Sequence, residues 1–559
     1  MEPRSDDREG IGALRRWGPI ALVTAVVLAM AAVGFVSGRS GDGDGVATPT
    51  SVAPAARPDG AVSWSMAEDQ GLQVTFPDSC DTDTGMVAIP FLFRAECFAD
   101  TDDNGGATAP GVTGDEIKVV AWLPAEDDPV RALLLQRIGF DATNAELREF
   151  YSRFAEVFQS TYQTYGRRVV LDFVEASGSI LDNTAARADA VRAAEDLGAF
   201  AVLGGPIIGG AWAEELQARG ITCVGCPGIS DPATVFSVPP SGGQVRSHLV
   251  AYVTAKLAGG DAQHAGEELR TQERVFGHLA LGMGTSDERS ATQLQEDLAE
   301  GGVELAEQIL YPLDPGRAAE LATNAVTRMQ SSGVTTVIVQ ADPILLPAFT
   351  QEATKQGWFP EWVLGGAPFI DTSTFARSFD QEQWSHAFGI SYFPPQVRPD
   401  ANPPYRLYEW FHGSPPPVEG SLPLLLLHPQ VSLFFTGLQH AGPVLTAQTF
   451  RDGLFLMPPT PRAVTQPSVS YGTQRWSSPD FAGVDDMVEL WWDPDAVGID
   501  ESGAEGRGMY RYVDGGRRHL VDEWESGLDA FDPDGTLLVV EDVPDDEEPP
   551  DYPPPAGGG

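Results

Sequence analysis

Four cysteines and one acidic loop are the residues whose types and spacing could bind a metal or carry redox chemistry. Cys223 and Cys226 form a CxxC pair, but a tetrahedral zinc site needs four ligands and the sequence offers no second pair. A redox CxxC of the thioredoxin kind opens a helix, whereas Pro227 and Gly228 follow this one. We therefore expect a small local disulfide or two packed thiols here, and no metal.

The acidic loop that begins at Asp100 matches the first half of a calcium-binding EF-hand loop. Asp100, Asp102 and Asn104 stand at ligand positions, and Gly105 stands at the turn. The twelfth position is Gly111, so the bidentate glutamate that completes such a site is missing. An Asx-rich turn is the simpler interpretation.

Enzyme motifs are absent from the sequence. It contains no GxSxG, no P-loop and no HExxH, and its eight histidines are scattered without metal-ligand spacing. The stretch GMGTSDE lacks the third glycine of a dinucleotide fingerprint. We expect a protein that is not an enzyme and has no cofactor, although missing local motifs leave open a catalytic set assembled in space.

The charge balance narrows the class of partner. The 559 residues include 35 Lys and Arg against 80 Asp and Glu, which gives a formal net charge of −45. Such a field repels phosphate backbones and anionic lipid headgroups, so we expect no nucleic-acid partner. The length exceeds one ordinary core and implies two or three structural units.

The N-terminal segment determines the expected compartment. Trp17–Ser37 carries no charge and is about as long as a helix that crosses a membrane, and Arg15 and Arg16 precede it. Positive charge kept on the cytoplasmic side leaves residues 1–16 inside and the bulk of the chain outside. We expect a single-pass anchor in the cell membrane at 17–37. A cleaved signal peptide is the alternative.

An extracytoplasmic location permits disulfides. Cys80 and Cys97 lie within 38–111, a linker and N-terminal extension with little apolar material. A disulfide between them would order a segment that can bury little apolar surface. We expect a Cys80–Cys97 bridge, with Cys223 and Cys226 as the second candidate pair.

Two successive runs of alternating strands and helices follow the extension. The first run has strands at 117–124, 167–176, 199–206 and 221–226, with helices at 145–165, 184–197 and 210–219 between them. After a helix at 241–258, the second run has strands at 274–282, 304–312, 334–341 and 362–366, with helices at 286–300 capped by Ser286, at 316–332 capped by Asp314, and at 343–356. This alternation is typical of parallel sheets with helical crossovers.

The expected domains follow from these runs. Lobe 1 spans 112–240, lobe 2 spans 241–385, and the chain returns to lobe 1 at 386–475, where 403–412 and 430–450 look helical. Residues 476–535 form a β-rich extension with a hairpin or small strand set. Residues 536–559 form an acidic disordered tail.

Three stretches carry a family resemblance: GVTGDEIKVVAWLP opens the first run, LGGP closes its third strand, and GVTTVIVQADPILLPAFTQEATKQGW lies in the second run. The arrangement resembles the periplasmic binding protein type 1 superfamily over residues 112–450. More closely, it resembles the extracellular substrate-binding proteins of branched-chain amino acid and amide ABC transporters. The resemblance implies an α/β fold with two Rossmann-like lobes. It also implies a membrane-anchored solute-binding protein that captures a small polar ligand between its lobes for an ABC importer and its permease. The alternative is a tethered sensor or receptor domain of the same fold.

The resemblance also indicates ligand-binding positions. In relatives that bind amino acids, hydroxyl groups after the third and fourth strands hold the ligand; this chain has Gly209 and Gly210 at the first position, which argues against an amino acid. Their N–H groups, at a helix N-terminus, suit an anionic or carbonyl group. Ser230 and Asp231 stand at the second position.

Three further candidates are Thr285, Asp342 and Trp122. Thr285 follows the first strand of the second lobe. Asp342 precedes Pro343 and fits an N-cap, with an ammonium partner as the alternative. Trp122 ends the first strand and fits core or rim packing, with ligand stacking as the alternative. We expect the ligand to be an amino acid, an amide or a small organic acid.

Overall fold

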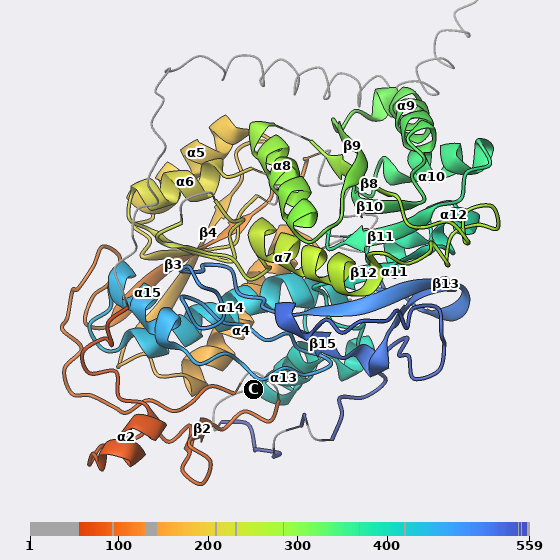
Figure 1. Ribbon diagram of the computed structural model, residues 1–559. Helices are drawn as coiled ribbons and strands as arrows, with labels where there is room; N and C mark the ends of the chain where they lie inside the picture. Colours follow the sequence, from red (N-terminus) through yellow and green to blue (C-terminus); the bar gives the residue numbers. More distant parts are fainter. Residues whose placement is uncertain are drawn as a thin grey trace, which may run out of the picture. The chain divides into compact units, whose positions relative to one another are not determined.

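The computed structural model describes residues 55–555 apart from 92–93, 129–141, 207–208, 230–231, 283, 368, 419–420, 546 and 549. The chain divides into two compact units. Unit 1 contains Ala258–Ile370 and Ser378–Ala387, and unit 2 contains the described residues of Val52–Leu257, Asp371–Arg377 and Phe388–Gly559 (Figure 1). The predicted membrane span Trp17–Ser37 lies outside the described residues, and within them no helix is long and apolar enough to cross a membrane.

Unit 2 is built on parallel strands. They lie in the order β4-β3-β5-β6-β7, and Val120 of β3 stands opposite both Asp172 of β4 and Val202 of β5. β3 is buried along most of its length because helices cover both of its faces. Two-residue β7 was not predicted, since it is too short to show a pattern. The bounds are β3 Glu116–Leu123, β4 Arg168–Glu175, β5 Ala201–Leu203, β6 Thr222–Val224 and β7 Val235–Phe236.

The helices of unit 2 lie on both sides of these strands. Figure 1 shows α5 and α6 on one side of β3 and β4, with α4 and α14 on the other. The apolar face of α4 is buried, but the helix ends at Thr161 instead of near Gly166, because Tyr162 already takes an extended conformation with φ −92° and ψ 150°. The bounds are α4 Asn144–Thr161, α5 Asn183–Val191 with a π-turn Arg192–Asp196, α6 Ala211–Ala218, and α7 Gly242–Tyr252 with a π-turn Val253–Leu257.

The predicted helix at 430–450 is wrong in its bounds. The structure has α14 Ser421–Ala441 and α15 Ala447–Leu456, separated at Gly442, which has φ 74°. Pro429, directly before the predicted start, lies inside α14 although proline removes an intrahelical hydrogen bond, so the helix begins earlier, at Ser421. α13 Pro403–His412 matches its prediction.

Antiparallel strands form the predicted β-rich extension of unit 2. They lie in the order β14-β13-β12, and β15 also pairs with β13. Trp492 of β13 stands opposite Tyr510 of β14, and both side chains are buried. The bounds are β12 Ala387–Ser391, β13 Met487–Ile499, β14 Glu505–Tyr512 and β15 Arg518–His519, with 3-10 turns Pro399–Ala401, Asp514–Gly516 and Val521–Glu523.

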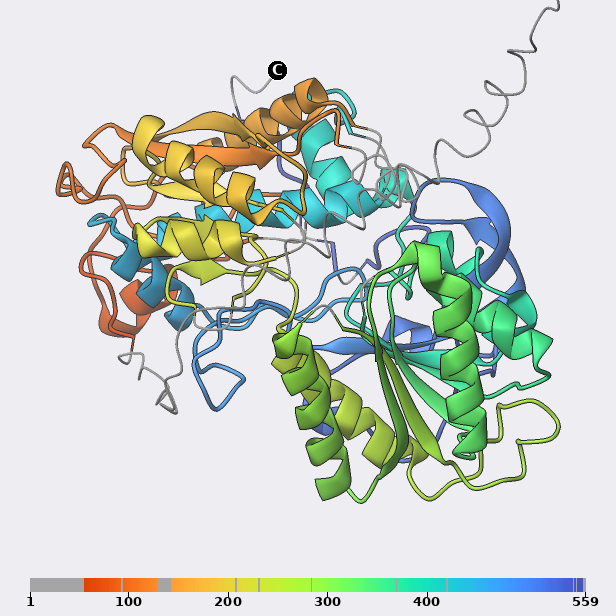
Figure 2. The ribbon, with the colours of Figure 1, turned by 90° about the horizontal axis from the view of Figure 1, so that it is seen from above.

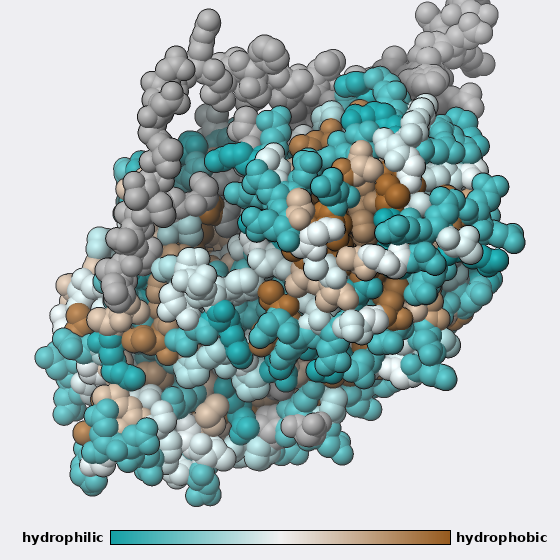
Figure 3. Space-filling model, viewed as in Figure 1, coloured by the Kyte–Doolittle hydropathy of each residue, from teal (hydrophilic) through white to brown (hydrophobic). Residues whose placement is uncertain are grey.

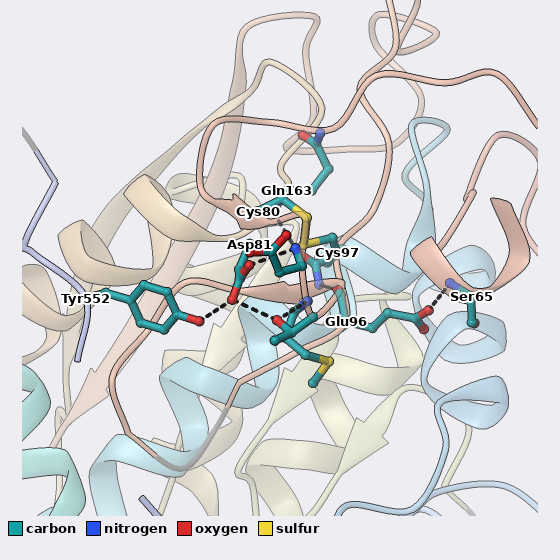
Figure 4. Close-up of a disulfide and its surroundings, with 11 residues drawn as sticks. Ser65, Cys80, Asp81, Glu96, Cys97, Gln163 and Tyr552 are labelled. Atoms are coloured by element: carbon teal, nitrogen blue, oxygen red, sulfur yellow. Dashed lines mark hydrogen bonds between the residues drawn. A yellow bond between two sulfur atoms is a disulfide. The ribbon is translucent and has the colours of Figure 1, made fainter. Parts of the chain in front are cut away.

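The N-terminal extension contains α2 Trp64–Gln70, β1 Cys80–Asp81 and β2 Met86–Val87. The predicted disulfide between Cys80 and Cys97 is present (Figure 4). It lies beside Asp81, whose carboxylate accepts a hydrogen bond from the Tyr552 hydroxyl. The extension is thus fixed both by its disulfide and by the far end of the chain.

The last segment of the chain was predicted as a disordered tail, and its described residues contradict that prediction. Val540 N donates to Gln396 O at 2.7 Å, Val464 N donates to a Glu547 carboxylate oxygen at 2.7 Å, and Trp410 Nε1 donates to Tyr552 O at 2.6 Å. Acidic composition indicated solvation, but backbone groups and the Glu547 carboxylate of the segment bind the rest of unit 2.

Unit 1 is the second α/β unit. Its parallel strands lie in the order β11-β10-β8-β9. The predicted cap Ser286 lies inside α8, which begins one residue earlier after Gly284, while Asp314 caps a 3-10 turn Pro315–Arg317 before α9. The bounds are β8 Phe276–Leu281, β9 Leu305–Tyr311, β10 Thr336–Gln340, β11 Glu361–Gly365, α8 Thr285–Glu300, α9 Ala318–Ser331, α10 Leu346–Lys355 and α12 Gln381–Trp384.

The boundary between the units differs from the predicted one at 240/241. Residues 242–257 belong to unit 2 because Lys256 pairs with the buried Glu489 of β13 at 2.8 Å. The short helix α11 Ser373–Ala376 also belongs there, since Arg377 binds Asp500 at 2.7 Å.

Hydrophilic residues cover most of the molecular face in Figure 3, as the acidic composition predicts.

Candidate functional site

The candidate site in unit 2 lies where β3, β5 and β6 end. These three strands are neighbours and run parallel, so their carboxyl ends meet at one edge. Trp122 stands next to the end of β3, residues 204–210 follow β5 and residues 225–231 follow β6. Ligands of open α/β sheets bind at such an edge, which makes these loops the place to look.

Two glycines allow a side chain from α14 to approach this edge. Gly204 and Gly225 have φ angles of 69° and 72°, and a Cβ atom on them would lie 2.8 Å and 2.3 Å from atoms of Gln430. The Oε1 atom of Gln430 accepts a hydrogen bond from the Tyr151 hydroxyl of α4 at 2.9 Å. Sequence reasoning missed Gln430 and Tyr151; the glycine directly after each strand was the only local signal.

The predicted pair Gly209 and Gly210 leads into α6. Gly210 is its N-cap and makes no side-chain cap bond, so the first N–H groups of α6 face the loop region without intrahelical partners. A Cβ atom on Gly209 would lie 2.9 Å from Asn183 Oδ1, and one on Gly210 would lie 3.2 Å from Ile229 Cγ2. The loops after β5 and β6 therefore approach each other at Gly210. Ser230 and Asp231 lie outside the described residues.

Trp122 packs at the same edge. It is buried, at 9% exposure, in a cluster that includes Ile180, Ala211 and Trp212, so the predicted core packing is confirmed. Its indole Nε1 atom is also buried and has no hydrogen-bond partner among the described residues. Because a buried donor without a partner is costly, this N–H needs an acceptor.

The polar groups around the edge are mostly used to hold the loops. The buried Asp128 accepts hydrogen bonds from Ile180 N at 2.7 Å and Ser179 Oγ at 3.1 Å. Trp212 Nε1 donates to Gly204 O at 3.1 Å. Cys223 of β6 and Cys226 in the loop after it are joined as a disulfide, the first of the two alternatives expected for this pair.

The candidate residues of unit 1 behave differently. Asp342 follows β10, and its Oδ1 atom accepts from Ile344 N at 2.8 Å and Leu345 N at 2.9 Å, while Oδ2 accepts from the Tyr311 hydroxyl at 2.7 Å. Oδ1 thus holds the turn 343–345 that leads into α10, and Oδ2 binds β9. The role of Asp342 is structural, but the predicted N-cap is displaced, because α10 begins at Leu346 with Leu345 as its N-cap. Thr285 begins α8, and the placement of its side chain is outside the described set.

The acidic loop after the first disulfide forms Asx turns. Asn104 Nδ2 donates to Gly114 O at 2.8 Å and to Tyr165 O at 2.9 Å, and Gly105 N donates to Asp103 Oδ1 at 2.8 Å. These bonds support the turn interpretation over the calcium one. The described part of the chain also holds no cluster of metal-ligating side chains.

Comparisons with known proteins identify the fold. No protein-family model and no curated protein matches the chain. Among solved structures, it is similar to the leucine-, isoleucine-, valine-, threonine- and alanine-binding protein of Brucella ovis in its closed conformation, with a TM-score of 0.51 and 13% identity over 76% of this chain and 100% of that one.

Two further solved structures have TM-scores of 0.45. One is the branched-chain amino acid transporter substrate-binding protein of Streptococcus pneumoniae with isoleucine, 14% identical over 71% of this chain and 100% of that one. The other is an ABC transporter solute-binding protein of R. palustris with 4-hydroxybenzoate, 11% identical over 70% of this chain and 97% of that one. The parallel strands of each unit and the likeness to the Brucella protein agree that this chain has the periplasmic binding protein type 1 fold.

Proposed function

We propose that this protein is an extracytoplasmic solute-binding protein that captures a small ligand at the carboxyl edge of β3, β5 and β6. The single observation that carries the proposal is the buried Trp122 N–H, which has no partner among the described residues and lies in one cluster with the start of α6. A ligand carboxylate or carbonyl would accept from this N–H and from the N–H groups that open α6.

The glycine pair narrows the class of ligand. Gly209 and Gly210 contribute no hydroxyl, so the start of α6 offers backbone N–H donors, which favours a ligand with a carboxylate or carbonyl group, such as a small organic acid or an amide. Leucine, isoleucine, valine, threonine and alanine, which the Brucella protein is named for binding, form the second class to test.

A thermal-shift screen of the full chain in mild detergent tests the proposal. A ligand that binds only the folded protein must raise its melting temperature. The panel contains small carboxylic acids, amides, urea and the five amino acids above. We expect at least one acid or amide to raise the melting temperature of the wild type.

Two matched variants locate the site. Gly210→Val places methyl groups against Ile229 and should abolish the ligand-induced shift, because its Cβ atom alone already lies 3.2 Å from that side chain. Gly242→Val is the control, since no atom lies within 4 Å of its Cβ position. Trp122→Phe should weaken binding about tenfold by removing one donor. Unchanged ligand shifts in both Gly210→Val and Trp122→Phe would contradict this site.

A membrane anchor at Trp17–Ser37 and an ABC permease as partner belong to the same proposal. The uncharged segment after Arg15 and Arg16 supports the anchor. After carbonate washing, the intact chain should remain in the membrane pellet. A soluble form that begins near Arg39 would contradict the anchor, and permease and ATPase genes beside its own would support the transport role.

A further inference from the structure

Unit 2 contains a second candidate site, a cavity of about 820 Å³. Its described wall includes none of the loops after β3, β5 and β6, so it is distinct from the site proposed above. The wall is formed by parts of the N-terminal extension, by segments 392–404 and 457–469, and by α14. A volume of this size is within the range of pockets that bind small organic molecules.

The wall is mainly apolar. Leu424 and Leu433 of α14 line it together with the rings of Phe91 and Tyr392. Prolines recur in both segments, and a proline has no backbone N–H. The wall therefore presents large apolar surfaces and few backbone donors.

One buried amide faces this cavity without a partner. Gln396 is 6% exposed, and neither its Oε1 nor its Nε2 atom has a hydrogen-bond partner among the described residues. Its backbone is fixed, since Val540 N donates to Gln396 O at 2.7 Å. Asn402, 8% exposed and on the same wall, also has an Oδ1 atom without a partner in the described part of the chain. Buried polar groups of this kind normally have partners, so their presence points to a ligand.

The charges of the wall disfavour an anionic ligand. Among its described residues, the carboxylates are Glu96, Asp371, Glu501 and Glu547, and the arginines are Arg94 and Arg462. Burial lowers the pKa of His428 to about 3 and that of His440 to about 4, so both are neutral at pH 7. A wall with more acids than bases disfavours an anionic molecule.

The carboxylates themselves are already engaged. Ser373 N donates to Glu501 at 3.0 Å, Val464 N donates to Glu547 at 2.7 Å, and Ser65 N donates to Glu96. These acids hold the protein around the cavity. The Gln396 amide, in contrast, has neither its donor nor its acceptor engaged among the described residues, so it is suited to recognise a ligand.

We propose that this cavity binds an uncharged, mainly apolar molecule that carries one amide-type group. The ligand carbonyl accepts from Gln396 Nε2, the ligand N–H donates to Gln396 Oε1 or Asn402 Oδ1, and the apolar part lies against α14 and the proline segments. An amide matches an amide because each offers a donor and an acceptor side by side.

Displacement of the neutral fluorophore N-phenyl-1-naphthylamine from the full chain tests this proposal. The competitors are decanamide, decanoate and decane, which share a chain length and differ in the head group. We expect decanamide to displace the dye at concentrations about tenfold lower than decanoate or decane do. The reason is that only decanamide has an amide that can pair with the Gln396 amide. Equal displacement by decanamide and decane would overturn the proposal, as would tighter binding of decanoate.

Three variants test whether the preference for decanamide arises at Gln396 in this cavity. Gln396→Leu should lower the affinity for decanamide about tenfold and leave decane unchanged, and the fold should persist because the amide it removes has no partner among the described residues. Ser432→Trp on α14 should fill part of the cavity and lower binding of the dye itself. Gln474→Leu, an exposed glutamine of the same unit, is the control. Unchanged decanamide binding in both Gln396→Leu and Ser432→Trp would overturn the proposal, whatever the outcome at Gly210.

Discussion

Asp480 and Asp485 are two residues of unit 2 whose ionisation depends on the fold. Burial raises the pKa of Asp480 to about 7 and that of Asp485 to about 6. Asp480 still accepts hydrogen bonds from Gln244 Nε2 at 2.8 Å and Ala482 N at 2.9 Å. These bonds do not offset the loss of water around the carboxylate, so the folded protein holds a proton that the unfolded chain releases.

This difference predicts how stability depends on pH. Between pH 4 and pH 7 the folded state binds more protons at Asp480 than the unfolded state, so the free energy of unfolding must fall as the pH rises through that window. Asp480→Asn should remove this contribution, worth on the order of 2 kcal/mol between pH 5 and pH 8. Melting temperatures across that range measure it.

Comparing Asp480→Asn with the wild type separates the contribution of Asp480 to the pH dependence of stability from the contributions of other titrating groups. Buried histidines such as His428, whose pKa is lowered, act in the opposite direction, and they are the same in both proteins. The exposed Asp115→Asn should leave the pH profile unchanged. A parallel pH profile in wild type and Asp480→Asn would disprove the assignment.

At the scale of elements, one buried ion pair connects the beginnings of two strands in unit 1. Arg274, just before β8, donates from Nε and one Nη atom to Glu361 of β11 at 2.8 Å and 3.0 Å. Both side chains are almost fully buried. Thr336 Oγ1 of β10 donates to the same carboxylate at 2.8 Å, so three strand starts share one acid.

Replacing one partner of this ion pair should lower the free energy of unfolding more than replacing both partners. Glu361→Leu leaves the Arg274 charge buried and should destabilise the protein by about 3–5 kcal/mol. The double variant Arg274→Met/Glu361→Leu should recover part of that loss, since no buried charge remains. Urea unfolding of the two single variants and the double variant gives the coupling energy. A double variant less stable than both singles would contradict the argument.

The Cys80–Cys97 disulfide constrains the N-terminal extension. It closes a separation of 17 residues, and a loop of that length corresponds to a stabilisation of about 3 kcal/mol. Cys80→Ala/Cys97→Ala should make the extension sensitive to limited proteolysis. The control is Cys223→Ala/Cys226→Ala, whose separation of 3 residues constrains the unfolded chain far less. Equal protection of the extension in both variants would contradict this role.

At the scale of the whole molecule, the net charge of −45 is the dominant property. Such an excess opposes the compact state through self-repulsion. Raising the ionic strength from about 0.01 M to about 1 M shortens the Debye length from about 30 Å to about 3 Å and should raise the melting temperature. NaCl and KCl should act alike, because screening depends on ionic strength. A melting temperature independent of salt would show that ion pairs already balance the repulsion.

The sequence determined the alternation of strands and helices and therefore the fold class. Strands such as 117–124 and helices such as 145–165 carry their apolar pattern within a few turns of chain, so their type could be predicted locally. The Cys80–Cys97 pair was predictable for the same reason, since a short segment with little apolar material needed a constraint. Their ends were less predictable: α4 ends early at Tyr162, where the next residues leave helical geometry.

The tertiary structure alone decided which distant groups meet. Nothing near Gly204 and Gly225 indicated that Gln430 of α14 would lie against both, or that Tyr151 would bind it. The same is true of Lys256 with Glu489, which assigns 242–257 to unit 2. The physical reason is that periodicity reports which face of an element is buried and not which element covers it. The types and order of the elements were thus readable from the sequence. Buried polar groups without a partner among the described residues, at Trp122 and Gln396, became visible only when their neighbours were in place.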